Sequence, residues 1–140
     1  MAVEFEITAD NSAEVLRELD SKIEAILEAW GIQGVGAVVD IITSESRVDT
    51  GAMRNSITHQ VDAGDQSVYI GTNIEYAIYH ELGTGIYLEG GGGRQTPWAY
   101  QDENGNWHRT RGMKPIHMIK NGVSGCVNDF KSIANDILKS

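Results

Sequence analysis

The chain has 140 residues, 41% of them hydrophobic, and a formal net charge of -9 at neutral pH. This length suffices for one domain with its own core, so folding requires neither a metal nor a disulfide. We therefore expect a single domain over residues 1–140. The acidic balance argues against a nucleic-acid-binding protein, because phosphate affinity comes from clustered Lys and Arg.

The single cysteine, Cys126, excludes an intramolecular disulfide and fits assembly in a reducing cytoplasm. On an apolar helical pattern, it is expected to be a small buried hydrophobic residue. The first residues lack a signal-peptide pattern, and we find no apolar run near the roughly 18 residues of a membrane span. A soluble protein is the expectation.

Charge is distributed unevenly along the chain. Residues 1–49 hold 11 acidic and 3 basic residues, a balance of -8, whereas residues 94–120 hold 5 basic and 2 acidic residues, a balance of +3. Two solvated faces are the simpler explanation. The alternative is that the basic segment of one copy contacts the acidic segment of a neighbouring copy.

The first half of the chain predicts a strand followed by a long helical region. Residues 3–7 alternate with period two and predict a short edge strand. Asp10-Asn11-Ser12 supplies a helix cap, and apolar residues then recur at helical spacing as far as Trp30. The glycines within 31–36 predict a kink or break, followed by a second helical stretch ending near Arg47. A β-branched cluster leaves a strand possible there.

The second half predicts two hairpins and a final helix. The runs 55–61 and 66–71 flank a turn-forming segment and predict two antiparallel strands. Four consecutive glycines then lie within a flexible assembly loop at about 86–114. Inside it, two tryptophans flank an Asn-Gly turn over 98–107, which predicts a long projecting β-hairpin loop. Pro115 opens a C-terminal helix expected to pack on the sheet beside the first helix.

These elements predict an α+β fold, with a long N-terminal helix and a C-terminal helix packed on a small antiparallel sheet. Two polar, glycine-punctuated strings, residues 48–57 and 75–85, are interpreted as turns that place side chains for assembly. Their candidate structural-motif residues are Asp49, Thr50, Gly51, Arg54, Tyr76, Tyr79, Glu81, Gly83 and Gly85.

The first string is expected to form a capped turn, in which Asp49 and Thr50 bind the backbone and Gly51 permits a backbone angle that other residues resist. Arg54 either braces this turn or pairs with Glu81. In the second string, Tyr76, Tyr79 and Glu81 are expected to form a helical turn. That turn closes the sheet, lines an interface or packs in the ordinary way.

The sequence contains no complete motif of the enzyme classes that it partly resembles. His80-Glu81-Leu82-Gly83-Thr84 begins like the zinc motif H-E-x-x-H but has Thr at the second ligand position. Gly90 to Gly93 lacks the Lys-Ser/Thr ending of a phosphate loop, and no serine or cysteine lies in a nucleophile-elbow setting. We expect no catalytic, cofactor or metal residues. The alternatives are a zinc-dependent hydrolase built on His80, Glu81 and a distant histidine such as His108 or His117, and a host-directed adaptor from a mobile element.

The two strings, with Gly71-Thr72-Asn73, Thr96-Pro97-Trp98 and Gly112-Met113-Lys114-Pro115, resemble the tail-completion, or neck, family of long-tailed bacteriophages. Members are often called minor tail or tail-component proteins. The resemblance covers roughly residues 10–138. It implies a non-enzymatic virion protein, assembled in the host cytoplasm, that forms an oligomeric ring at the head-tail junction.

The resemblance also implies a set of partners. These are further copies in a ring, expected to be sixfold, and other neck proteins, the tail terminator or tail tube, and the head connector. DNA is expected to pass through without specific binding, and no membrane is involved. A ring needs one patch to meet a different patch on the next copy. The candidate intersubunit or tube-facing residues are Trp98, Tyr100, Trp107, Arg109 and Arg111.

Overall fold

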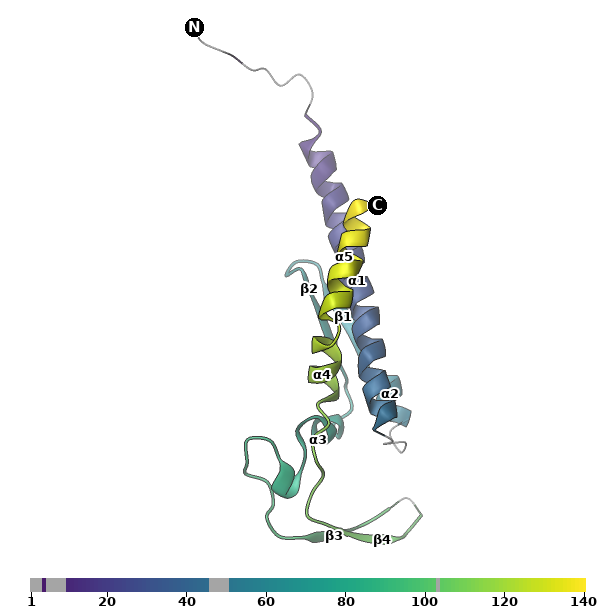
Figure 1. Ribbon diagram of the computed structural model, residues 1–140, viewed down its shortest axis with the longest axis vertical. Coiled ribbons are helices and arrows are strands. Elements are labelled where there is room, and N and C mark those ends of the chain that lie inside the picture. Colours follow the sequence, from purple (N-terminus) through teal and green to yellow (C-terminus); the bar gives the residue numbers. More distant parts are fainter. Residues whose placement is uncertain (1–3, 5–9, 46–50, 103) are drawn as a thin grey trace.

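The computed structural model describes Glu4 and residues 10–45, 51–102 and 104–140. The helices are α1 (Ser12–Ser44), α2 (Gly51–Ser56), α3 (Ala77–Leu82), α4 (Met118–Ser124) and α5 (Val127–Lys139), with a 3-10 turn η2 (Gly85–Tyr87). The strands are β1 (Thr58–Asp62), β2 (Ser67–Gly71), β3 (Trp98–Gln101) and β4 (Trp107–Thr110). Figure 1 shows an elongated molecule in which α1 and α5 lie side by side and β3 and β4 cross the far end. The α+β class is confirmed, whereas the strand expected over 3–7 lies outside the described residues.

Helix α1 runs as one unbroken helix of 33 residues, so the predicted break within 31–36 and the alternative strand are wrong. Two of its glycines serve close packing instead. A side-chain carbon at Gly31 would overlap the His59 ring, and one at Gly34 would overlap the end of Ile70. Both glycines are buried, because the β1–β2 hairpin presses directly on the helix there. The predicted end near Arg47 lies outside the described residues.

The β1–β2 hairpin is confirmed, with a register that runs from Thr58 opposite Gly71 to Asp62 opposite Ser67. The Asp62 side chain accepts the backbone N–H of Asp65 across the turn, at 3.1 Å. The first strand begins later than predicted, because residues 51–56 form α2. That short helix places Met53 in the core, where its side chain is fully buried.

The C-terminal region is two helices and not one. Helix α4 begins at Met118, beyond Pro115, and α5 follows after Gly125 and Cys126. Both helices make most of their contacts with α1, which also packs against the β1–β2 hairpin. Trp30 of α1 donates its indole N–H to the Phe130 carbonyl at 2.8 Å, and the two rings lie 5.3 Å apart.

The core lies where α1, α2, α3 and α4 meet. Its buried side chains come from all of these segments and from the residue between α2 and β1: Val38, Ile42, Met53, Ile57, Ala77 and Met118. Cys126 is buried as expected, and burial, helped by the negative charge of Asp129, raises the pKa of its thiol.

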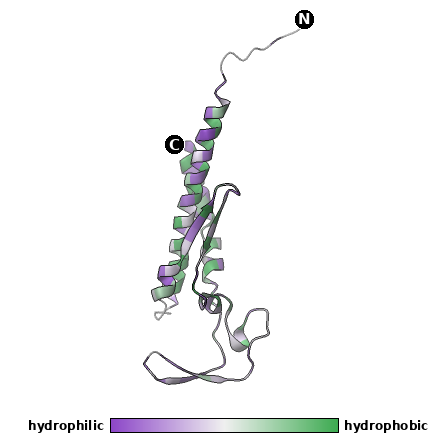
Figure 2. Cartoon of the chain, turned by 180° about the vertical axis from the view of Figure 1, so that it is seen from behind, coloured by the Kyte–Doolittle hydropathy of each residue, from purple (hydrophilic) through white to green (hydrophobic). Residues whose placement is uncertain are grey.

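Helix α1 contains a longer apolar stretch than expected, because no run near the length of a membrane span was predicted. Figure 2 shows apolar and polar residues mixed around it. Among the residues that the structure describes, α1 alone is long and apolar enough to cross a membrane by length and composition, with a mean hydropathy of 1.5 in its best 18-residue window. A core helix of a soluble protein passes the same test, and α1 packs against β1, β2, α4 and α5.

Candidate assembly interface

Strands β3 and β4 form the predicted projecting hairpin, here called the arm (residues 98–110). Trp98 pairs with Thr110 at its base, and Gln101 pairs with Trp107 before the turn. The Asp102 carboxylate closes the turn by accepting the backbone N–H groups of Asn104 and Asn106, at 2.9 and 2.8 Å. Figure 1 shows the arm beyond the lower ends of the helices. The segment after β2 therefore carries a hairpin away from the helical body.

The arm presents two chemically different faces, because alternate residues of a strand point to opposite sides. On one face Tyr100 stacks on His108, with ring centroids 5.3 Å apart. On the other face lie Trp107 and Arg109; Trp107 is 70% exposed, and Arg109 is also exposed. The five candidate interface residues are therefore brought to one arm and its base, but not to one surface.

The Trp98 side chain at the base of the arm is less exposed to solvent than the Trp107 side chain near its end. Trp98 is half-buried, and the Arg94 guanidinium lies over its ring at 5.4 Å from the centroid. Arg111 is exposed just after β4. Exposed aromatic and arginine side chains are the groups that most often dominate protein interfaces. Trp107 is the arm residue best placed for such a contact.

The arm should lose a stabilising contribution in acid. A hydrogen bond from His108 Nε2 to Asp102 at 2.7 Å, and then the Asn106 backbone N–H, hold the pKa of Asp102 below its ordinary value. A lowered carboxyl pKa stabilises the folded state above the ordinary value of about 3.9, and this contribution is lost as pH falls through the folded-state pKa. We expect protection of the Asn106 amide from hydrogen exchange to fall over that acidic range.

Asp102→Asn is the control, since it removes the titrating group and keeps an acceptor in the turn. Its arm should be less protected at neutral pH and should lack the acid-dependent step that Asp102 causes. An identical acid profile in both proteins would show that Asp102 does not stabilise the turn.

The arm is joined to the body at a tight crossing of two segments, here called the arm root (residues 83–86 and 111–113). The Thr84 and Ile86 N–H groups donate to the Met113 and Arg111 carbonyls, at 2.9 and 3.1 Å. The Met113 N–H returns to the Thr84 hydroxyl at 2.9 Å. Gly85 has φ 62°, and a side-chain carbon there would overlap the Arg111 carbonyl. The second signature string thus ends in a fixed root for the arm.

Glu81 has a role that the sequence did not reveal. Its two carboxylate oxygens accept the backbone N–H groups of Ile119 and Lys120, at 2.8 and 3.1 Å. These N–H groups belong to the first turn of α4 and have no partner within that helix. The Ile116 N–H donates to the His80 carbonyl nearby. Glu81 therefore caps α4 from α3 and holds the two ends of the arm segment together.

Removing the Glu81 carboxylate should lower the free energy of unfolding by about 1–2 kcal/mol, since two helix N–H groups lose a charged acceptor. Thermal and urea unfolding of Glu81→Ala measure this loss. Glu81→Gln should recover part of it, because an amide oxygen still accepts one N–H. The matched control is Glu75→Ala, an exposed position just before α3. Equal stability of the Glu81 and Glu75 variants would contradict the capping role.

The tyrosines of the second string lie on the surface. The helical turn expected there is confirmed as α3. Tyr76 and Tyr79 are both exposed, and it is Ala77 between them that enters the core. Ile78 is exposed beside them. These two tyrosine rings therefore do not pack in the core.

The first string is only partly described, because Asp49 and Thr50 lie outside the described residues. Gly51 begins α2 without a positive φ, so the expectation that it adopts an unusual backbone angle is wrong. Arg54 donates to the Thr43 hydroxyl at the end of α1, at 3.3 Å. Glu81 is committed to α4 instead. The proposed Arg54–Glu81 pair is therefore not formed.

The histidines lie at separate places. His108 contacts Asp102 on the arm, His117 lies 3.5 Å from Glu89, and His59 contacts Glu28 of α1. Within the described ranges, no group of three or more His, Cys, Asp or Glu side chains is arranged to hold a metal ion. The ligand set imagined for a zinc hydrolase, with His80, His108 and His117, is thus not brought together.

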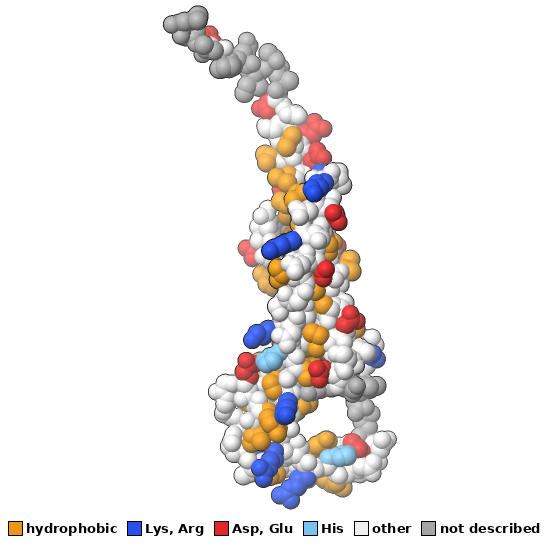
Figure 3. Space-filling model, viewed as in Figure 1, with side chains coloured by type: hydrophobic (Ala, Val, Ile, Leu, Met, Phe, Trp, Pro, Cys, Tyr) orange, Lys and Arg blue, Asp and Glu red, His pale blue; other side chains and the backbone are white. Residues whose placement is uncertain are grey.

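Charged side chains are distributed unevenly over the described part of the molecule. Figure 3 shows Lys and Arg side chains concentrated at the arm end, with others on the helices, and acidic side chains along the whole helical body from the first turns of α1 downward. The first turns of α1 extend past α5 and expose Val15, Leu16 and Leu19 between the acids. An apolar, acidic end and an aromatic, basic end are thus both available on one copy.

Comparison with known proteins identifies one family. The model of the family described as "Bacteriophage HK97-gp10, putative tail-component" matches residues 9–83, just over half of the chain. The matched part contains both signature strings as far as Gly83, whereas the arm follows it. No curated protein matches the chain. No solved structure matches it either. The chain therefore belongs to the HK97-gp10-like family of bacteriophage tail components.

Proposed function

We propose that this chain is a structural, non-enzymatic protein of the virion that forms a closed ring at the head-tail junction of a long-tailed phage. The observation that carries the proposal is the arm, a fixed hairpin that presents Trp107 and Arg109 away from the helical body. The Trp107 side chain is 70% exposed in the single copy. A protein built for contact with neighbouring copies accounts for this exposure.

The distribution of charge supports a repeated contact of one copy with the next. A ring requires two different, complementary patches on each copy, so that every copy both gives and receives a contact. Arg109 lies on the aromatic arm and Arg94 and Arg111 lie beside its base, whereas acidic side chains lie along α1. A net charge of -9 also suits a ring through which DNA slides, because negative walls offer phosphate no favourable site.

In this role the ring is sixfold, is assembled in the host cytoplasm and contacts other phage proteins above and below. Those are the head connector on one side and the tail terminator or tube on the other. The protein binds neither a cofactor nor a membrane, and DNA passes without specific recognition.

Immunogold electron microscopy of phage particles tests the proposal. An antibody to this chain should label the head-tail junction or the upper end of the tail. Antibody adsorbed with the purified protein is the control. Label absent from particles, while the lysate contains the protein, would remove it from the virion and favour a host-directed adaptor.

A further inference from the structure

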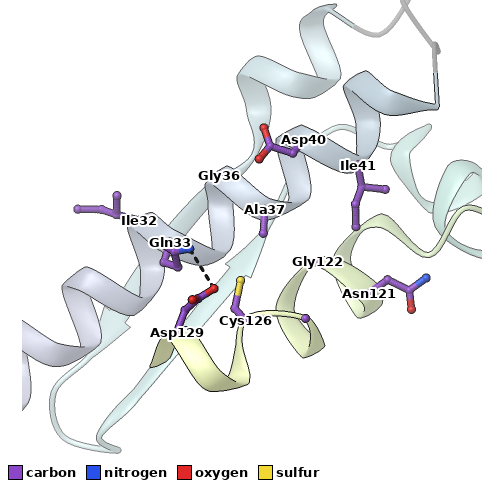
Figure 4. A pocket seen from close by; sticks show the side chains of 11 residues that line it. Ile32, Gln33, Gly36, Ala37, Asp40, Ile41, Asn121, Gly122, Cys126 and Asp129 are labelled. Atoms are coloured by element: carbon purple, nitrogen blue, oxygen red, sulfur yellow. Dashed lines mark hydrogen bonds between the residues drawn. The ribbon is translucent and has the colours of Figure 1, made fainter. Parts of the chain in front are cut away.

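A groove of about 550 Å³ lies between α1 and the helices α4 and α5. Its lining includes small residues from both sides, Gly36 and Ala37 from α1 and Gly122 and Gly125 from α4 and its C-terminal end. Figure 4 shows Gly36 and Ala37 on α1 opposite Gly122 and Cys126 on the C-terminal segment. The groove is therefore a property of how the C-terminal helices cross α1.

No contact within the single copy explains why residue 36 is a glycine. A glycine inside a helix is destabilising compared with alanine, so its presence needs an explanation. Gly31 and Gly34 have one, because side chains of the β1–β2 hairpin occupy the space beside them. At Gly36 an added side-chain carbon would meet no atom within 4 Å. The glycine keeps the groove open and leaves room for a group from outside.

The groove combines a few apolar side chains, among them Ile32, Ala37 and Ile41, with negative charge. Ile32 stands at one end and is 63% exposed, an unusual position for a large aliphatic side chain. Asp40 and Asp129 supply a carboxylate from each side, and the latter accepts a hydrogen bond from Gln33 at 3.4 Å. The lining residues include neither Lys nor Arg. An occupant should therefore be apolar, with a cationic group beside the apolar part.

One surface of this same chain has that composition. Trp107 and Arg109 are two residues apart on β4 and so share one face of the arm. Both are exposed, whereas the opposite face is occupied by the stacked Tyr100 and His108. Figure 1 shows the arm beyond the end of the helices that form the groove, so the contact joins two copies.

We propose that the Trp107–Arg109 face of the arm in one copy occupies the α1–α4–α5 groove of the next copy. The indole lies over the small residues around Gly36, and the guanidinium reaches Asp40 or Asp129. The arm and the groove are different patches, so the contact is heterologous and repeats from copy to copy until the ring closes. This inference rests on the proposed ring and names its receiving site.

Filling the groove tests the proposal without harming the fold. In Gly36→Leu a strong helix former replaces glycine where the single copy has space, so the melting temperature should stay unchanged or rise by a few degrees. Assembly, measured by native mass spectrometry and light scattering over a concentration series, should require at least tenfold more protein. Ala25→Leu, at an exposed position of α1 away from the groove, should assemble as the unaltered chain does.

Mixing two defective variants tests the pairing itself. Gly36→Leu keeps an intact arm and Trp107→Ala keeps an intact groove, so each alone should remain monomeric at a concentration at which the unaltered chain assembles. An equimolar mixture should form a 1:1 dimer and nothing larger, because one intact arm and one intact groove make one contact. A Gly36→Leu protein that assembles normally, or a mixture that stays monomeric, would overturn the inference.

The outcomes separate the two proposals. If the unaltered chain and Ala25→Leu assemble while Trp107→Ala does not, the arm contact holds whatever the groove variant does. If the unaltered chain stays monomeric at every concentration and is absent from particles, the ring itself is wrong and the groove pairing falls with it.

Discussion

Alanine in place of Trp107 is expected to leave the free protein folded and to weaken its assembly by about thirtyfold or more. The Trp107 side chain is 70% exposed in the single copy, so its loss removes little buried surface from the fold. Central aromatic residues of interfaces contribute about 2 kcal/mol or more, which corresponds to that factor. Circular dichroism and thermal unfolding measure the fold, and native mass spectrometry measures assembly.

Trp30→Ala is the matched control for this tryptophan. The Trp30 indole donates to the Phe130 carbonyl and packs against the Phe130 ring, so its loss separates α1 from α5. We expect a loss of about 2–4 kcal/mol in the free energy of unfolding for this half-buried side chain. If Trp107→Ala lowered the melting temperature as much as Trp30→Ala, Trp107 would belong to the core and not to an interface.

Alanine at Gly85 is expected to separate the two segments that cross at the arm root. The position has a positive φ, and its new side chain would overlap the Arg111 carbonyl, so the crossing segments must move apart. We expect a cost of about 3 kcal/mol or more, which combines the backbone penalty with lost hydrogen bonds. Hydrogen exchange at the Ile86 and Met113 amides should become fast, because both amides donate across the crossing.

Gly91→Ala separates the two parts of this cost. Gly91 also has a positive φ, of 78°, but a side-chain carbon there would meet nothing within 4 Å. It should therefore cost only the backbone penalty of about 1–2 kcal/mol and leave the exchange of Ile86 unchanged. Similar effects of the two substitutions would show that crowding at Gly85 is unimportant and that the root is not a tight crossing.

Local patterns predicted the elements whose causes are local. The amphipathic repeat located α1, and turn residues located both hairpins, including the Asn104-Gly105 turn where Gly105 has φ 83°. The exposed end of the arm was also predictable, since a tryptophan on a polar hairpin has little core to enter. These features depend on residues close together in the chain.

Features that depend on contacts between distant parts of the chain could not be predicted from local sequence patterns. Glycines within a helix predict a break unless a neighbour needs the space, and only the fold shows His59 and Ile70 beside Gly31 and Gly34. Glu81 lies 38 residues before the first N–H that it caps, so no local motif reveals it. Gly36 looks like its neighbours in the sequence, and only its empty surroundings distinguish it.

In the proposed assembly, copies of this chain form a ring in which each arm contacts the next copy. Cryo-electron microscopy of the head-tail junction in purified phage particles tests this most directly, because it shows chains and contacts together. We expect a ring of this chain, with density for Trp107 over Gly36 of the adjoining copy. A junction fully explained by other proteins, in particles that lack this chain, would contradict it.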